Sequence, residues 1–445
     1  MQNILYFFLI NNIIFFFSDC NYRNLFIFAT FIIIIAINMS ISLLFNNSDS
    51  ISLSALKTFN LKKDLVKLLT IDGENTIPNL SKETGYSIPK ITKLIGELLE
   101  EGIVHDFGKI GTAGGRRPSI YGINPNAFYF LGVDVKKSAI TIGLQSADSK
   151  NVQISEDVEY LLENTRESLD TLCKIINHFI DRSKVQRKKI VGACINLGGR
   201  INSHEGFSYS FFYFDEKPLA TVIESKIGVK TYIENDSRAM TFGEYNCGVV
   251  QSEQEVLMIN LSWGLGMGIV CKGQLYYGKS GYSGEFGHSP VFDNDIICQC
   301  GKKGCLETEV SGQALERKVK EKLRAGASSS LTRMYDLDSI TVDNIIEAVN
   351  EHEDVLAIEV IEEMGEKLGR YIAMLVNIFN PELVIIGGTL AAVSSYIQLP
   401  IQTALRRHSL NLVNQDVKFK TAKLGVNAGV VGACHIVRGK FFGLI

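Results

Sequence analysis

The sequence has no excess of charge of either sign and too few cysteines for a disulfide scaffold. Its formal net charge is −3 over 445 residues, so any nucleic-acid contact must come from a local basic patch. Nine cysteines do not make a disulfide framework in a chain of this length, and three of them cluster as Cys-x-Cys-x4-Cys. Such a cluster is typical of metal ligation in a reducing compartment, so we expect a cytoplasmic protein.

Residues 1–52 lack the features of a targeting segment. Their apolar run at 25–37 is broken only by Thr30, but it is shorter than the ~20 residues that a membrane-spanning helix needs. A basic region and a small-residue cleavage site are also missing, which argues against a secretory signal. Three interpretations remain: a membrane anchor, a buried extension, or upstream DNA read in frame with the true start at Met39. The bias towards Phe, Ile and Asn favours the last.

A chain of 445 residues is too long for one ordinary domain, so two or three are expected. With 46% hydrophobic and 21% charged residues it can bury a large core. Residues 53–122 show three short amphipathic helices, and a turn at Gly85 separates the second from the third. This spacing is typical of a helix-turn-helix. Lys90 and Lys93, near the start of the third helix, are therefore expected to contact DNA.

A wing is expected after these helices. "VHDFGKIGTAGGRRPSIYGIN" (104–124) predicts two short strands around a glycine-rich loop that carries Arg116 and Arg117. Paired arginines in such a loop suit a narrow minor groove or a phosphate contact. The alternative is a three-helix module that binds another protein.

Residues 123–445 alternate glycine-bearing strand turns with helices. Strand-turn patterns occur at 128–149, 189–206, 256–278 and 381–391, and a long amphipathic helix is expected over 356–379. This alternation predicts an α/β architecture. Two such sheets, each with a loop facing a shared cleft, would form a two-lobed domain.

One segment of this domain carries a candidate metal site. His288, Cys298, Cys300 and Cys305 offer one nitrogen and three sulfurs, which is a full tetrahedral set for Zn²⁺. Because no coordination position stays open, we expect the zinc to be structural.

Two carboxylates, Glu285 and Glu307, lie within a few residues of these ligands. They are either solvated loop charges or members of a binding pocket. Together with Asn235 and Asp236 they would present oxygen acceptors and one amide, a set suited to sugar hydroxyls. Arg200 and the aromatic run 208–214 are expected to edge such a pocket, although Arg200 is equally compatible with a surface charge.

Several motifs resemble the ROK family of repressors, open reading frames and sugar kinases. The similar segments are "LSWGLGMGIVCKGQLYYGKSGYSGEFGH" (261–288), "YIENDSRAMTFGEY" (232–245), "CQCGKKGCLETEVSG" (298–312) and "NIFNPELVIIGG" (377–388). The resemblance covers roughly residues 128–440. It implies an actin-like, hexokinase-like (ribonuclease H-like) fold, a structural zinc, and sugar binding by Asn235, Asp236, Glu285, His288 and Glu307. The helices and "GGRRP" before it resemble the repressor branch.

The chain departs from the kinases of this family at their phosphate loop. Those kinases carry Asp-x-Gly-Gly-Thr after the first strand, where glycines admit phosphate to the backbone. Here Asp134 is followed by Val-Lys-Lys-Ser, although Gly387 and Gly388 of a later turn are kept. In a kinase, Asp236 would be the general base. Without the glycines we expect no enzyme.

The sequence therefore predicts a sugar-responsive transcriptional regulator, most simply a repressor. Its expected partners are operator DNA and a monosaccharide or phosphorylated sugar. A homo-oligomer, dimer or tetramer, is also expected, because one helix-turn-helix contacts too little DNA for tight binding. The alternatives are an ATP-dependent sugar kinase of the ROK type and a sugar-binding scaffold whose helices contact protein.

Overall fold

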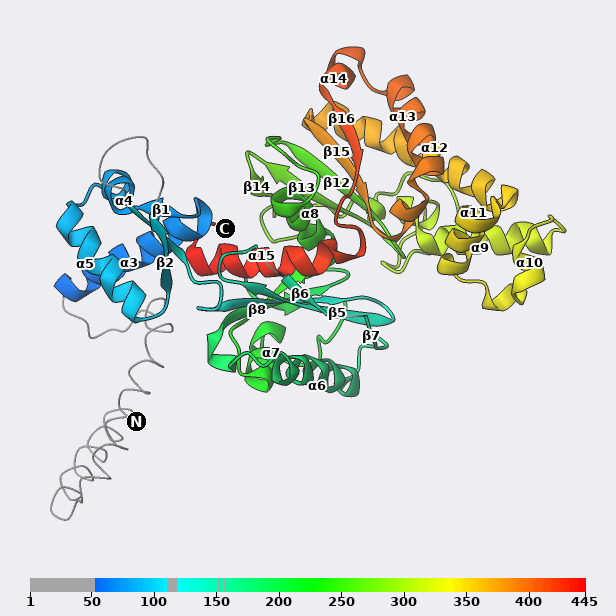
Figure 1. Ribbon diagram of the computed structural model, residues 1–445. Coiled ribbons are helices and arrows are strands. Elements are labelled where there is room, and N and C mark those ends of the chain that lie inside the picture. Colours follow the sequence, from blue (N-terminus) through cyan, green and yellow to red (C-terminus); the bar gives the residue numbers. More distant parts are fainter. Residues whose placement is uncertain (1–52, 110–117, 151, 156) are drawn as a thin grey trace. The chain divides into compact units, whose positions relative to one another are not determined.

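The computed structural model describes residues 53–109, 118–150, 152–155 and 157–445 (Figure 1). The chain divides into two compact units between Phe128 and Tyr129. Among the described residues, no helix is both long enough and apolar enough to cross a bilayer.

The first unit contains three helices and a small antiparallel sheet of order β1-β3-β2. Its elements are α3 (Leu53–Ile71), β1 (Asn75–Thr76), α4 (Ile77–Thr84), α5 (Ile88–Glu100), β2 (Val104–Lys109) and β3 (Ser119–Ile123). Thr76 caps α4 by accepting a hydrogen bond from the Asn79 backbone N–H, and Gly85, at φ 72°, ends the helix in the left-handed conformation. Leu65, Leu80 and Ile91 bury one face of each helix in a common core.

The expected helices and the two expected strands are present in this unit. The short strand β1 was not predicted. Arg116 and Arg117 lie outside the described residues.

The second unit contains two sheets with the same strand topology. The first has the order β11-β8-β4-β5-β6, with β7 beside β5, and the second has the order β16-β15-β12-β13-β14. In each, an antiparallel hairpin (β4–β5 or β12–β13) is extended by two later strands that run parallel to its first strand. The strands are β4 (Tyr129–Val135), β5 (Ala139–Ser146), β6 (Val152–Ile154), β7 (Val158–Glu159), β8 (Ile190–Leu197), β11 (Thr231–Asn235), β12 (Val256–Leu261), β13 (Leu265–Cys271), β14 (Gln274–Leu275), β15 (Leu383–Gly387) and β16 (Lys418–Thr421).

Helices cover these sheets and make the second unit two-lobed (Figure 1). Those beside the first sheet are α6 (Arg166–Arg182) and α7 (Leu219–Ile227), and those beside the second are α9 (Gly312–Arg324), α10 (Leu331–Met334), α11 (Val342–His352), α12 (Val355–Phe379), α13 (Ser394–His408) and α14 (Asn411–Asp416). Each lobe has its own apolar core. The core of the first lobe includes Ile142 and Ile176, and that of the second lobe includes Ile259 and Ile361. The long helix expected over 356–379 is α12.

Two further helices lie between the sheets and join the lobes. Helix α15 (Ala428–Phe442) packs on β4, β5 and β8, and α8 (Asp236–Cys247) packs on α15 and on β12 and β13. The two helices meet at Gly243 and Gly432, where a Cβ atom would collide with the backbone of the partner helix. Close backbone approach at this crossing holds the N-terminus of α8 between the lobes.

Candidate functional site

The N-terminus of α8 carries the first two candidate ligand residues. Asn235 caps the helix by accepting from the Arg238 backbone N–H at 3.1 Å, and its amide donates to the Gly199 carbonyl at 3.0 Å. Asp236, the first helical residue, accepts from the Ser237 backbone N–H at 2.7 Å. Burial raises the pKa of Asp236, and the nearby Glu285 carboxylate raises it further. That electrostatic effect places Glu285 and Asp236 in one neighbourhood.

His288 links this neighbourhood to the cysteines. It ends a single 3₁₀ turn, Phe286–His288, and its Nε2 lies 3.7 Å from the Glu285 carboxylate. Its other ring nitrogen, Nδ1, lies 3.4 Å from the Cys298 sulfur. The Nδ1 atom of the imidazole is therefore directed at the candidate metal ligands, and the Nε2 atom at a candidate sugar-binding carboxylate.

The four predicted metal ligands converge. The ligand atoms of His288, Cys298, Cys300 and Cys305 all lie within 4.8 Å of one another, and the Cys300 and Cys305 sulfurs are 3.6 Å apart. Bond lengths of about 2.0–2.3 Å to a tetrahedral zinc imply edges of roughly 3.3–3.8 Å between ligand atoms. The Cys300–Cys305 distance and the 3.4 Å between Cys298 and His288 fit those edges, so the cluster has the chemistry of a Cys₃His site and is compatible with its spacing.

Glu307 lies beside the cluster but is not a free loop charge. One carboxylate oxygen accepts from the Leu265 backbone N–H at 3.0 Å, and the other lies 3.4 Å from the Cys298 sulfur. A side chain at Gly264 would collide with this carboxylate. Glu307 therefore fixes the glycine turn between β12 and β13 to the candidate metal loop.

A buried ion pair that was not predicted from the sequence holds the segments of the candidate site together. Glu234 and Arg238 are almost fully buried and joined at 2.7 Å. Arg238 also donates to the carbonyls of Ile201 and Gly281, and Tyr277 donates to Glu234 at 3.1 Å. These bonds tie the start of α8 to the loop that carries Glu285. The i, i+4 spacing of Glu234 and Arg238 could have indicated an ion pair. Pairs at this spacing on a helix are, however, usually exposed to solvent.

The two hairpin turns that face each other across the lobes touch through side chains. The turn between β4 and β5 holds Lys137, and the equivalent turn between β12 and β13 holds Trp263. The Lys137 ammonium lies 3.6 Å from the centre of the indole ring. Beneath the first turn, burial raises the pKa of Asp134 to about 6, and Asn196 lies 3.5 Å from its carboxylate. A side chain thus occupies the turn in which the family's kinases have glycine.

The remaining predicted residues lie in the first unit. Lys90 and Lys93 are both exposed on the N-terminal half of α5. The Lys90 ammonium is 4.2 Å from the ring centre of Tyr86, which is itself 41% exposed, and Lys93 lies 4.0 Å from Glu97. These lysines are solvated and accessible at the start of the third helix.

Comparison with known proteins identifies the class to which the second unit belongs. The family model described as ROK family matches residues 130–440, so this chain belongs to the ROK family. The chain is 28% identical over 391 residues to the xylose repressor of Caldicellulosiruptor bescii, which covers 85% of this chain and 96% of the relative.

Two solved structures show how far the likeness extends. A ROK family transcriptional regulator, a homologue of the Escherichia coli MLC protein, superposes with a TM-score of 0.71 and 28% identity over 87% of this chain and 98% of its own. A ROK glucokinase from Streptomyces griseus, bound to glucose and AMPPNP, superposes with a TM-score of 0.61 and 26% identity. The match covers 70% of this chain and 99% of the glucokinase chain. The actin-like, hexokinase-like fold expected from the sequence is confirmed.

Proposed function

We propose that this protein is a sugar-responsive regulator of transcription that acts as a repressor. The observation that carries the proposal is the position of Asp236 at the start of α8, between the two sheets, where burial and the carboxylate of Glu285, 3.7 Å from His288, raise its pKa. These groups offer hydrogen-bond acceptors to the hydroxyls of a monosaccharide or phosphorylated sugar, with Asn235 and Glu307 on either side. The repressor and regulator names of the relatives support the same role.

Zinc is proposed as the structural cofactor. His288, Cys298, Cys300 and Cys305 would hold it, and the filled coordination shell would leave it no part in chemistry. Its contribution is to fix the His288 ring so that Nε2 faces Glu285, and to hold Glu307 against the second glycine turn.

The first unit is proposed as a winged helix-turn-helix that binds operator DNA in the cytoplasm. In support of this, α4 and α5 flank a left-handed Gly85 turn, and exposed lysines begin α5. Lys90 and Lys93 would contact the major groove, and Arg116 and Arg117, between β2 and β3, would contact the minor groove or phosphates. A domain of residues 53–122 would then read DNA, and residues 123–445 would bind the sugar.

Coupling of sugar binding to DNA release requires at least two DNA-binding domains, so a dimer or tetramer is proposed. Sugar bound between the lobes would favour one closure angle, which sets the readers at a spacing that no longer matches two half-sites. Asp236 would then bind the ligand rather than act as a general base, because the first hairpin turn presents Lys137 instead of a glycine cradle.

The test pairs DNA binding with sugar response. We expect Glu285→Ala to keep its salt-dependent mobility shift on the protein's own promoter but to lose release of that DNA by sugar. Glu362→Ala, on the exposed face of α12, is the matched control and should respond normally. Normal sugar release by Glu285→Ala would refute the site. Turnover of ATP with a panel of sugars would support the kinase alternative instead.

A further inference from the structure

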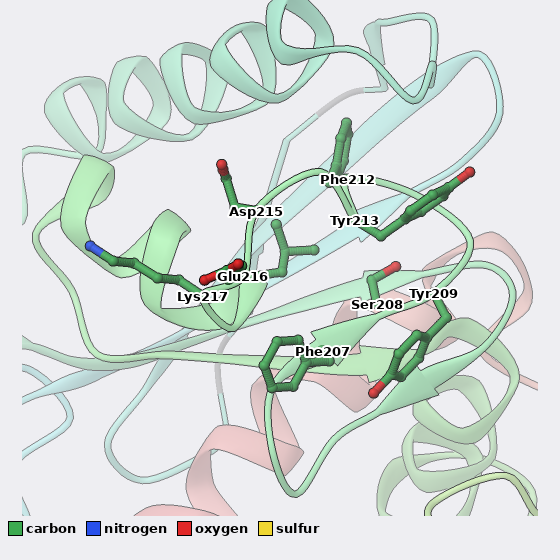
Figure 2. A pocket seen from close by; sticks show the side chains of 9 residues that line it. Phe207, Ser208, Tyr209, Phe212, Tyr213, Asp215, Glu216 and Lys217 are labelled. Carbon is green, nitrogen blue, oxygen red and sulfur yellow. The ribbon is translucent and has the colours of Figure 1, made fainter.

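An aromatic cavity is lined largely by the run 208–214, which the sequence placed at the edge of the sugar pocket, and its shape gives that run a more specific role. Its volume is about 260 Å³, and it lies in the segment between β10 (Phe207–Ser208) and α7 (Figure 2). The residues that line it are Phe207, Ser208, Tyr209, Phe212, Tyr213, Asp215, Glu216, Lys217 and Leu219. This volume lies just below the range of about 300–1,000 Å³ that holds drug-sized ligands, so it suits a single ring.

The cavity is joined to the sugar site by short contacts. The Tyr209 backbone N–H donates to the Arg200 carbonyl at 2.9 Å, and the Arg200 N–H donates to the Ser210 hydroxyl at 2.9 Å. The preceding Gly199 accepts from Asn235. On the other side, the Tyr209 ring lies 6.2 Å, edge to face, from that of Tyr282, three residues before Glu285. The cavity lining therefore contacts the Arg200 loop on one side and Tyr282 on the other.

Tyrosine rings stand open to solvent around this cavity. Tyr209 is 47% exposed, Tyr213 57% and Tyr282 37%, and Phe207 lies 6.4 Å from Tyr209 at an interplanar angle of 31°. Large rings with a polar tip that gather on a surface mark a place where a ligand covers them. A pyranose ring fits such a wall, because its C–H face packs on an aromatic ring while its hydroxyls reach the polar groups.

The polar groups of the cavity favour a neutral polyol. Asp215 is already neutralised by Arg166, whose two terminal nitrogens lie 2.8 and 3.3 Å from its carboxylate oxygens. Within the described part of the chain, no hydrogen bond or ion pair engages Glu216, whereas the Lys217 side chain extends away from the aromatic rings (Figure 2). A carboxylate beside the hydroxyls of Ser208 and Tyr209 suits the hydroxyl groups of a sugar better than a phosphate.

We infer that the aromatic cavity is a second sugar subsite, so that the effector is a disaccharide or longer oligosaccharide whose second ring packs on Tyr209. The inference rests on the proposed sugar-sensing function and deepens it. The first ring occupies the groups around Asp236 and Glu285, and the glycosidic bond passes the Arg200 loop. Nothing is cleaved, and the second ring adds affinity and selectivity.

The experiment is calorimetric titration of the full-length protein with matched sugars. The pairs are xylose and xylobiose, glucose and cellobiose, and glucose and maltose. We expect one disaccharide to bind at least tenfold more tightly than its own monosaccharide. In Tyr209→Ala that advantage should vanish, so that the two affinities become equal. Tyr276→Ala, 48% exposed and outside the cavity lining, is the matched control and should keep the full advantage.

The outcomes separate this inference from the function on which it rests. Equal affinity for mono- and disaccharides in the wild type overturns the second subsite and leaves sugar sensing intact, and so does an unchanged advantage in Tyr209→Ala. Absence of binding by every sugar overturns both. If Tyr209→Ala melts below the wild type, Tyr213→Ala replaces it with the same expected result.

Discussion

At the scale of single residues, the site depends on charges that are held away from water. Arg238 is 2% exposed, and its guanidinium satisfies Glu234 and two backbone carbonyls from separate segments. Removal of one member of such a pair leaves the other buried and uncompensated, which usually costs more than the pair itself contributes.

We therefore expect Arg238→Met to lower the free energy of unfolding by about 3–5 kcal/mol, because Glu234 loses its charge partner. Arg407→Met is the matched control, since the Arg407–Glu366 pair is 63% exposed on both sides and should change stability by less than about 1 kcal/mol. Urea unfolding of both variants measures the difference. Equal effects would show that the buried network does not support the fold.

Asp134 makes stability depend on pH in the sense opposite to a salt-bridged carboxylate. Burial raises its pKa from 3.8 to about 6, so the folded protein binds this proton more tightly than the unfolded chain. The stability it contributes is complete below about pH 4 and is lost as the pH rises through 6. Asp134→Asn should therefore stabilise the protein at pH 8, on the order of 1–3 kcal/mol, and have little effect near pH 4.5. Urea unfolding at both pH values measures this difference. An equal change in the free energy of unfolding at the two pH values would contradict the prediction.

Residue types and spacing were sufficient to predict part of this chemistry. His288 and the three cysteines could be grouped because soft ligands at such spacing have few other uses. The role of Arg238 could not be predicted from the sequence, because the burial of its side chain depends on loops at residues 201 and 281 that are distant in the sequence. Glu307 was predicted as a ligand group, but its bond to the Leu265 N–H depends on a turn formed by two strands.

At the scale of elements, the candidate metal loop between His288 and Cys305 is held by few regular backbone contacts. The segment between His288 and Cys305 has two isolated bridges, Pro290 with Cys305 and Ile297 with Lys303, in place of a helix or strand. Val291 and Phe292 pack against the core of the second lobe, but Ile297, near the cysteines, is 70% exposed. Metal binding would stabilise that part of the loop directly.

Cys300→Ser is expected to lose bound zinc and to lower both the melting temperature and the sugar response, because the loop would no longer fix His288. Cys271→Ser, a cysteine outside the four-residue cluster, should retain one zinc per chain. Metal analysis by mass spectrometry and thermal unfolding measure both effects. Wild-type zinc content in Cys300→Ser would refute the assignment.

Elements with a strong local signal were predictable, and their arrangement was less so. Glycine turns marked the hairpins β4–β5 and β12–β13, and helical spacing marked α12, because both are local patterns. The repeated order of the two sheets could not be derived from local patterns, since β15 pairs with β12 only after more than 100 intervening residues. The family resemblance supplied that part.

At the scale of the whole molecule, sensing requires that the two lobes change their separation. Helices α8 and α15 form the inner layer between the lobes, and their glycine contact allows little sliding. The outer contact between the hairpin turns is a single ammonium over an indole ring, worth about 0.5–2 kcal/mol. Movement is therefore expected to open at the turns rather than at the helix crossing.

Trp263 gives this movement a built-in optical reporter, because it is the only tryptophan in the sequence. Its emission originates from one point, the contact between the two hairpin turns, and it should shift or change in intensity when the Lys137 ammonium moves. Titration with an effective sugar is expected to give a saturable fluorescence change, and Lys137→Met should alter the starting emission and reduce that change. A spectrum that stays constant while the sugar releases DNA would mean that the turns remain closed during signalling.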